Sequence, residues 1–443
     1  MEASHVLAME PRPDECVGGS FSTWRLRSAQ QKPQVVANTV EIGARKRRSV
    51  EGRQNESRVT TTTAAAAASS SAWEACKTFQ DRKQDARPAA SRHTALIVTS
   101  DFSYRLIDDF LAPRELAPTE VMIRNKAVGL NHIDWKSVEH RFCLPTLPWV
   151  TGREMAGVVE QVGARVERVR KGDRVWTSTY YRDRRAGCFQ DLVVVPQHTV
   201  FPIPSCLDFH TAAALGVAGL TAAMTLWKWL RVPIPTPVPR PRQTTVLASN
   251  APEEERQVML VWGGSTATGQ FAVQLATRAG FEVIAVCSEA TAPLVRSLGA
   301  AEVVTYTHRT DTQVIDEILH LAGNRLTKAV DLVGSTTTEM VLRVIASSSG
   351  RVDEVDFAPL ACMSKGTIVP TNVKVHTVEM KQFVLDQTCA IYGERLNQLI
   401  EDGLVRIPPI SVLKGGLGAV EGGLRRVKEG SLEGRKLVVS LCS

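Results

Sequence analysis

Between residues 258 and 333 the hydrophobic positions follow two alternating patterns, short apolar runs and longer segments with helical spacing. The apolar runs are rich in β-branched residues and predict buried strands, whereas the helically spaced segments predict amphipathic helices. The predicted strands are Val258–Trp262, Glu282–Cys287, Glu302–Tyr306 and Lys328–Val333, and the predicted helices are Thr268–Ala279, Thr291–Leu298 and Thr312–Leu321. This alternation is typical of an α/β fold with a doubly wound parallel sheet.

The hydrophobic pattern before residue 200 instead predicts strands separated by turns. These strands are Ala95–Val98, Val121–Val128, Met155–Val162 and Gly187–Val195, with a turn at Lys171–Val175 that enters another strand. Gly157 lies inside one of them and predicts a bulge or a close approach of two backbones. We expect Asp134 to cap a short helix over Trp135–Glu139. Together these elements predict a small β-barrel-like domain.

Three further segments complete the pattern. Asp208–Leu230 is rich in small residues and has helical spacing, with Asp208 as the predicted N-cap. Val232–Arg242 carries five prolines and therefore predicts a surface loop or linker. Near the end of the chain the pattern predicts helices over Glu394–Asp402 and Leu417–Glu429, and a closing strand over Lys436–Leu441.

Residues 1–90 show no sustained periodicity and include a Thr/Ala/Ser tract over Thr60–Ser71, so we expect this tail to be disordered. The tail holds 14 Lys/Arg against 10 Asp/Glu, which is more than half of the net charge of +7. The basic run Arg45–Arg48 could be a nuclear address or an anion-binding patch, but a solvated charge cluster is the interpretation we favour.

The composition is that of an ordinary globular protein, with 44% hydrophobic and 22% charged residues. No apolar run reaches about 18 residues, so we expect no membrane span. The acidic residues in Met1–Gln30 argue against a secretory signal or a transit peptide. The nine cysteines form no C-x-x-C pair, which favours reduced thiols in a cytoplasmic protein. No nucleic-acid module is present in the pattern, and we expect no nucleic-acid partner.

The turn after Trp262 carries the first functional signal. Gly263, Ser265 and Thr268 occupy the positions of the dinucleotide fingerprint G-x-G-x-x-G, and Gly269 comes one position late. The turn alone could be a plain strand-to-helix connection. Because strands and helices continue to alternate after it, we interpret the turn as a dinucleotide site, with phosphate at the helix N-terminus.

The end of the second predicted strand indicates which dinucleotide is bound. NAD-binding folds usually place an acid there to hold the ribose 2′-hydroxyl. Here the strand ends at Cys287-Ser288, and Glu289 follows one position later. The small hydroxyl leaves room for a 2′-phosphate, and Arg296 and Tyr306 could face it, so we favour NADP(H). The alternatives are a solvated helix residue for Arg296 and a core aromatic for Tyr306.

Several segments together resemble the medium-chain dehydrogenase/reductase superfamily over Ala95–Leu441. They are Asn131–Lys136 (NHIDWK), Gly152–Val159 (GREMAGVV), Gly172–Val175 (GDRV), the turn at residues 263–269 and Leu298–Val304 (LGAAEVV). The hydroxyl-rich turn, the Cys287-Ser288 strand end, the proline-rich loop and Lys428–Val439 further resemble the lovastatin-type, trans-acting enoyl reductases that work beside fungal polyketide synthases.

The resemblance implies a GroES-like domain and a Rossmann domain with the cofactor between them. We place the GroES-like domain at residues 91–215, completed by 371–443, and the Rossmann domain at 216–370, with the proline-rich loop at 232–256. Zinc-dependent members carry a Cys within the segment matching Asn131–Asp134 and a His at the position of Arg153. Arg153 cannot bind zinc, Cys188 stands alone where a four-cysteine lobe would be, and a lone His132 makes no site, so we expect no metal.

Enoyl reduction without zinc needs a donor near the thioester oxygen and an acid near the α-carbon. Related stand-alone reductases carry a Tyr where this chain has Phe142, which has no proton to give. The resemblance favours Lys136 as the polar group, followed by Thr221. Lys136 could also be a solvated helix residue, and bulk water could supply the proton. His132 replaces a Pro common at its position, which puts the local loop shape in doubt.

The resemblance also implies cofactor and substrate contacts. The implied cofactor-binding residues are Ile133, Asp134, Trp135, Lys136, Ser265, Thr266, Ala267, Thr268, Ser288, Glu289, Ala290, Thr291, Arg296, Tyr306, Val355, Leu413 and Lys414. The implied substrate-lining residues are Ala213, Ala214, Leu215, Gly216, Val217, Ala218, Gly219 and Leu220.

The sequence therefore predicts an NADPH-dependent, zinc-free enoyl reductase of secondary metabolism. Its expected substrate is an α,β-unsaturated polyketide thioester held on the acyl carrier domain of a partner synthase, and we expect it to act as a monomer without a membrane partner. The alternatives are a quinone or enone reductase acting on free small molecules, and a non-catalytic NADPH-binding protein.

Overall fold

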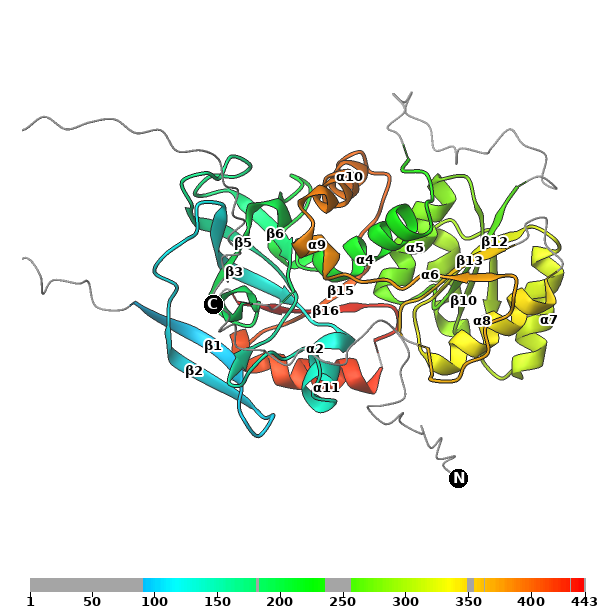
Figure 1. Ribbon diagram of the computed structural model, residues 1–443, viewed down its shortest axis with the longest axis horizontal. Helices are drawn as coiled ribbons and strands as arrows, with labels where there is room; N and C mark the ends of the chain where they lie inside the picture. The colour runs from blue at the N-terminus through cyan, green and yellow to red at the C-terminus, as the bar shows by residue number, and fades with distance from the viewer. Residues whose placement is uncertain are drawn as a thin grey trace, which may run out of the picture. The chain divides into compact units, whose positions relative to one another are not determined.

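The computed structural model describes residues 91–180, 183–235, 256–348, 354–361, 363–430 and 432–441. Their strands form three sheets, one parallel and two largely antiparallel. The predicted tail of residues 1–90 and residues 236–255 of the proline-rich loop lie outside the described residues. Figure 1 shows the strands of the antiparallel part in blue to green, joined by red strands from the end of the chain.

The antiparallel part is built from two sheets. The smaller sheet has the order β2-β1-β4, with β1 at Arg92–Val98, β2 at Tyr104–Leu111 and β4 at Trp149–Val150. The larger sheet has the order β15-β16-β3-β5-β6-β8, and β7 also pairs with β3. Its strands are β3 (Glu120–Gly129), β5 (Glu154–Val162), β6 (Arg174–Ser178), β7 (Leu192–Pro196), β8 (Val200–Pro202), β15 (Ile410–Leu413) and β16 (Lys436–Ser440).

Gly157 marks the close approach that the sequence predicts. A Cβ atom there would lie 2.2 Å from the carbonyl oxygen of Arg124, and the β3–β5 register shifts between Asn125 and Ala127. The predicted strand over Gly187–Val195 is wrong in its first half, because β7 begins only at Leu192.

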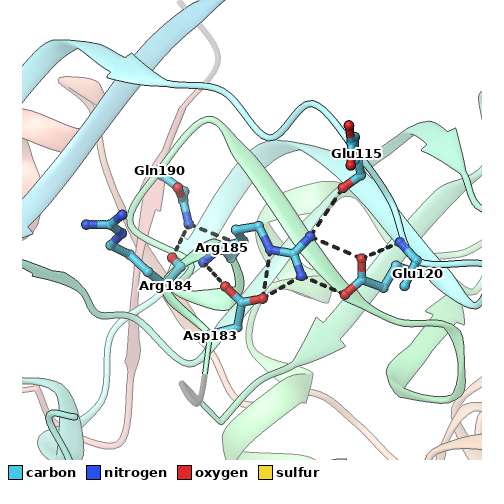
Figure 2. A network of polar contacts seen from close by, with 7 residues as sticks. Glu115, Glu120, Asp183, Arg184, Arg185 and Gln190 are labelled. Carbon is cyan, nitrogen blue, oxygen red and sulfur yellow. Dashed lines mark hydrogen bonds and ion pairs between the residues drawn. The ribbon is translucent and has the colours of Figure 1, made fainter. Parts of the chain in front are cut away.

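A side-chain network explains that late start. The Gln190 amide donates hydrogen bonds to the carbonyls of Arg184, Arg185 and Gly187 and folds the segment into a turn. Arg185 then ties this turn to β3 and to Asp183, with Nη2 donating to Glu120 at 2.8 Å and Nε to Asp183 at 2.7 Å (Figure 2).

The six-stranded sheet is parallel and has the order β11-β10-β9-β12-β13-β14. Its strands are β9 (Val258–Trp262), β10 (Glu282–Cys287), β11 (Glu302–Thr305), β12 (Leu326–Asp331), β13 (Val355–Pro359) and β14 (Val373–Val375). The helices that connect them are α5 (Ala267–Arg278), α6 (Ala292–Ser297), α7 (Asp311–Ala322) and α8 (Ser335–Ser347). Strand β14 begins at Val373, three residues after residue 370, where the sequence analysis places the end of the Rossmann domain.

Alternate side chains of β9 place these helices on opposite faces of the parallel sheet. Met259 and Val261 pack in one hydrophobic cluster with residues of α5 and α6. Val258, Leu260 and Trp262 pack in another with residues of α7 and α8. Both faces are covered, as the doubly wound architecture requires.

Helical turns over Phe209–Trp229 follow the antiparallel strands. They comprise α3 (Phe209–Ala212), a π-helical turn over Leu215–Gly219, α4 (Leu220–Met224) and a second π-helical turn over Thr225–Trp229. The predicted N-cap is confirmed, because the Asp208 side chain accepts a hydrogen bond from the Thr211 N–H at 2.7 Å.

Among the described residues, this 21-residue stretch has the length and composition of a membrane span, with a mean hydropathy of 1.4 over its most apolar 18 residues. The sequence predicts a helical segment here, but its apolar composition over a full membrane-spanning length was not recognised. However, 72% of its most apolar window is buried inside the fold, as expected for the core helix of a globular domain.

The remaining helices are α2 (His132–Glu139), α9 (Gln382–Leu385), α10 (Ala390–Glu401) and α11 (Val420–Glu429). The prediction that Asp134 caps α2 is wrong. Asn131 is the N-cap, and Asp134 is the third residue of the helix, where its side chain accepts a hydrogen bond from the Asn131 N–H at 2.9 Å. Helix α2 therefore begins three residues earlier than predicted.

Candidate active site

The turn between β9 and α5 is shaped by two glycines and one hydroxyl. Gly263 has a φ angle of +88°, a conformation that glycine adopts without strain. The Thr266 hydroxyl accepts a hydrogen bond from the Gly269 N–H at 2.9 Å and so caps α5. A Cβ atom on Gly269 would lie 2.1 Å from the Gly263 carbonyl oxygen. The first N–H groups of α5 have no partner within the helix, which suits them to bind a phosphate.

Three neighbouring strands bring predicted cofactor residues together at their carboxyl-terminal ends. Trp262 pairs with Val286, and Cys287 pairs with Thr305, so β9, β10 and β11 end at the same level. The turn, Ser288 and Tyr306 follow these strand ends directly. Ser265, Thr266, Ala267 and Thr268 are half-buried there, and Tyr306 is 50% exposed, which argues against a core aromatic.

The tip of β10 carries hydroxyls and a nearby cation. Ser288 Oγ and Thr291 Oγ1 lie 2.9 Å apart. Glu289 and Ala290 are exposed, and the Glu289 N–H donates to Thr307 Oγ1 at 3.0 Å. Burial raises the pKa of the Cys287 thiol, and the rise is partly offset by a hydrogen bond with Thr291 and, to a smaller extent, by the positive charge of exposed Arg296.

Val355 lies at the opposite end of the strands, the amino-terminal end. It opens β13, and Asp356 after it pairs with Lys328, near the start of β12. We therefore leave Val355 out of the site. Val333, which the sequence analysis placed at the end of a strand, lies beside the turn instead. A Cβ atom on Gly263 would approach its Cγ2 atom to 2.9 Å.

Helix α2 presents Lys136 beside aromatic side chains. The Lys136 ammonium lies 5.7 Å from the centre of the Trp135 ring, and Trp135 Nε1 donates to His132 Nδ1 at 3.3 Å. Among the described residues no carboxylate forms an ion pair with Lys136. Crowding by protein atoms around the ring, together with the positive charges of Lys136 and Lys436, lowers the pKa of His132 to about 4, even though the residue is exposed at the surface. His132 is therefore neutral at neutral pH.

A buried polar cluster lies at the base of α2 and consists of Asn131, Asp134, Glu154 and Lys436. Lys436 Nζ lies 2.6 Å from Glu154 Oε1 and also donates to Asn131 Oδ1. Asn131 Nδ2 donates to Glu154 Oε1 at 2.8 Å. Burial raises the pKa of Asp134 to about 7, against the positive charges of Arg153 and Lys436, which lower it. With no exposed surface, the Asp134 side chain cannot contact a cofactor, whereas Ile133 is half-buried.

Gln270 connects the turn to this cluster. Its Nε2 atom donates to the Ser265 carbonyl at 2.9 Å and to the Gly434 carbonyl at 2.6 Å. Gly434 lies two residues before Lys436. The segment that enters β16 is therefore linked to the turn through Gly434 and Gln270, and to the buried cluster through Lys436. Glu154, Lys436 and Gln270 were not among the site residues predicted from the sequence. A usable signal for Glu154 and Lys436 is that each is a charged residue followed directly by a run of apolar strand residues.

The predicted substrate-lining residues lie mainly in the core. Of residues 213–220 only Val217 keeps appreciable exposure, and the half-buried Thr221 follows them. Their small side chains serve packing, since a Cβ atom on Gly216 would lie 2.5 Å from the Thr177 carbonyl oxygen. Leu413 pairs with Val439, three residues beyond the Lys436 pairing, so Leu413 and Lys414 are not brought to the cluster.

The side chains at the expected metal position do not fit zinc. Arg153 is a permanent cation, and burial raises the pKa of the Cys188 thiol well above its usual range. Among the described residues no group of three His, Cys, Asp or Glu side chains is placed to hold a metal ion. We derive no step through a metal.

Two family models match the chain, the alcohol dehydrogenase GroES-like domain over residues 117–205 and the zinc-binding dehydrogenase domain over residues 267–378. Dehydrogenase azaJ of Aspergillus niger is 30% identical over 339 residues, which cover 72% of this chain and 91% of that protein. The chain belongs to the medium-chain dehydrogenase/reductase superfamily. Trans-enoyl reductase iccB of Talaromyces variabilis is 29% identical over 376 residues, covering 79% of this chain and 96% of that protein.

The fold agrees with this membership. A quinone oxidoreductase from Pseudomonas syringae superposes with a TM-score of 0.61 at 23% identity, covering 78% of this chain and 99% of that structure. The predicted GroES-like and Rossmann architecture is thus confirmed. Further fungal relatives also carry the name trans-enoyl reductase. The chain is an oxidoreductase of the kind that acts on carbon–carbon double bonds.

Proposed function

We propose that the protein is an NADPH-dependent, trans-acting enoyl reductase of secondary metabolism. Its substrate in this proposal is an α,β-unsaturated polyketide thioester held on the acyl carrier domain of a partner synthase. The names of the fungal relatives support the reaction class. We expect the enzyme to work as a monomer in the cytoplasm.

The observation that carries the cofactor assignment is the composition of the β10 tip. Ser288 and Thr291 place two hydroxyls 2.9 Å apart, and Arg296 adds a positive charge nearby. Hydroxyls and an arginine suit a 2′-phosphate, whereas NAD-binding folds usually place a carboxylate there. Glu289 is exposed, and its backbone N–H is bound to Thr307. The turn over Ser265–Thr268 would hold the pyrophosphate at the start of α5.

The nicotinamide, when bound, supplies the hydride that reduces the β-carbon of the thioester. The chain must then stabilise negative charge on the thioester oxygen and allow a proton to reach the α-carbon. Lys136 is suited to the first task, because its half-buried ammonium has no carboxylate partner among the described residues. The half-buried hydroxyl of Thr221 could donate a hydrogen bond to the same oxygen.

Turnover assays with purified protein test the proposal. We expect NADPH oxidation with an enoyl thioester on a carrier domain and slower oxidation with the same acyl group on a small thiol. Reduction of free quinones without turnover of any enoyl thioester would instead make the protein a quinone or enone reductase. NADPH binding without turnover of either substrate class would make it a non-catalytic binding protein.

A further inference from the structure

Glu154 is the point at which four chain segments meet. Its Oε1 atom accepts from Asn131 Nδ2 at 2.8 Å and lies 2.6 Å from Lys436 Nζ. Its Oε2 atom accepts from the Val217 N–H at 2.6 Å. The carboxylate therefore joins the start of β5, the N-cap of α2, the π-helical turn over Leu215–Gly219 and the start of β16.

The surrounding sequence makes room for this carboxylate. A Cβ atom on Gly129 would lie 2.3 Å from Glu154 Oε1, and one on Gly216 would lie 2.8 Å from Glu154 Cβ. Neither position could carry a larger residue without displacing Glu154. Glu154 has no exposed surface, and Lys436 is 5% exposed. Well-packed apolar residues often replace such buried pairs without loss of stability, so stability alone does not explain this one.

The two carboxylate oxygens of Glu154 contact the two segments that carry Lys136 and Thr221, the groups that the proposed chemistry uses. Asn131, held by Oε1, precedes Lys136 by five residues at the start of α2. Val217, held by Oε2, precedes Thr221 by four residues in the adjacent helical segment. One carboxylate thus holds both the N-cap of α2 and the π-helical turn that leads into α4. Lys436 places an opposite charge 2.6 Å from this carboxylate in the core.

We propose that Glu154, held by Lys436, is a positioning residue that sets the placement of Lys136 relative to Thr221. It does not contact the reacting atoms itself. Gln270 and Gly434 extend the same connection to the cofactor turn, so the spacing is set relative to that turn as well. This inference rests on the proposed function, because it assigns a purpose to the spacing of two groups used in that reaction.

The test compares single and double variants. Glu154→Gln and Lys436→Met each leave one buried charge without its partner, so each should lower Tm. The double variant removes both charges and should recover most of that loss. A Gln amide has only one accepting oxygen, so it cannot hold Asn131 and Val217 together. We expect kcat of the double variant to stay at least about tenfold below wild type, with Kd for NADPH within about threefold.

Recovery of wild-type kcat together with Tm would overturn the proposal, because the pair would then serve stability only. Asn131→Ser gives a second test that leaves no buried charge unpaired and keeps a capping residue. It should lower kcat while Kd for NADPH is kept, and an unchanged kcat would likewise contradict the proposal. The matched control is Arg325→Met/Glu282→Gln, a half-buried pair with Nη1 and Oε2 2.5 Å apart in the parallel sheet. It should change Tm without changing kcat.

A readout that needs no turnover separates this inference from the proposed function. Amide hydrogen exchange in α2 and in residues 215–221 should be faster in the double variant than in the control variant. If wild-type enzyme reduces no enoyl thioester, the proposed function fails, and exchange still reports whether Glu154 orders both segments. If wild type turns over and exchange in the double variant is unchanged, the positioning role fails.

Discussion

The carbonyl oxygen of Gly263 occupies the space that a side chain on Gly269 would need, at 2.1 Å from the Cβ position. Gly263 is the first residue after β9, and Gly269 lies in the first turn of α5. Their contact therefore sets how closely the helix N-terminus approaches the strand end. Close approach at this point is what allows backbone N–H groups to reach a pyrophosphate.

Gly269→Ala should therefore disrupt the cofactor turn. Relieving the clash requires a backbone shift, which typically costs about 1–3 kcal/mol of stability, and we expect NADPH to bind at least about tenfold more weakly. Titration of NADPH fluorescence and thermal unfolding measure the two effects. The control is Gly422→Ala in α11, where an added Cβ meets nothing within 4 Å. That variant should be neutral or gain up to about 1 kcal/mol, and equal effects in both variants would contradict the prediction.

Arg296→Ala should weaken NADPH binding much more than NADH binding. A charge-assisted hydrogen bond to a phosphate is worth about 1.5–3 kcal/mol, which corresponds to roughly a ten- to hundredfold change in Kd. Calorimetric titration with both cofactors tests this. Arg343→Ala, an exposed arginine on α8, is the control and should change neither value. Parallel losses for both cofactors at Arg296 would remove it from 2′-phosphate recognition.

Lys136→Ala should reduce turnover while NADPH affinity stays close to wild type. Losing one preorganised donor at a developing oxyanion typically costs about 10²–10³ in kcat, and Lys136→Arg should recover part of it by restoring the charge. Steady-state kinetics and cofactor titration separate the two effects. Lys374→Ala, an exposed lysine of β14, should match wild type. If Lys136→Ala loses affinity and turnover equally, Lys136 belongs to the cofactor site.

His132 should titrate near pH 4 rather than near its ordinary value of 6.5. Since the unfolded chain then binds this proton more tightly than the folded one, His132 should lower stability as pH falls from about 6.5 to about 4. Asp134, with a pKa raised to about 7, should act in the opposite direction over much of that range. NMR titration of the imidazole carbons isolates His132. Its pKa should rise in Lys136→Met, and a value near 6.5 in wild type would contradict the expected environment.

The parallel sheet could be predicted from the sequence because each of its first strands buries a continuous apolar run and each helix shows one apolar face. Helix α8 was missed because it opens with Ser335, Thr336 and Thr337, residue types that do not favour a helix interior. In the structure the carboxylate of Asp331, at the end of β12, accepts from the Thr337 and Thr338 hydroxyls at 2.8 and 2.6 Å. Side-chain hydrogen bonds to the end of the preceding strand thus support the start of a helix that residue propensity does not indicate.

The candidate site likewise has a part that could be predicted from the sequence and a part that could not. Contacts local in sequence, such as the Thr266 cap and the Ser288–Thr291 pair, lie within segments that the motif already indicated. The buried cluster could not be found, because Asn131 and Lys436 are separated by 305 positions and meet only through the pairing of β3 with β16. The family resemblance implied that residues 213–220 line the substrate, but all of them except Val217 are buried. In the structure they allow close helix packing.

The pairing of β16 with β3 also orders events during synthesis of the chain. The hydrophobic cluster under α7 and α8 draws only on residues 258–375, so the parallel sheet can collapse on one face as soon as those residues leave the ribosome. Strand β3 emerges far earlier, and β7 pairs with the first half of one edge, yet Ala127–Gly129 stay unpaired on that edge until residues 436–440 arrive. Throughout that interval a three-residue stretch of β3 lacks the backbone hydrogen bonds that β16 later supplies.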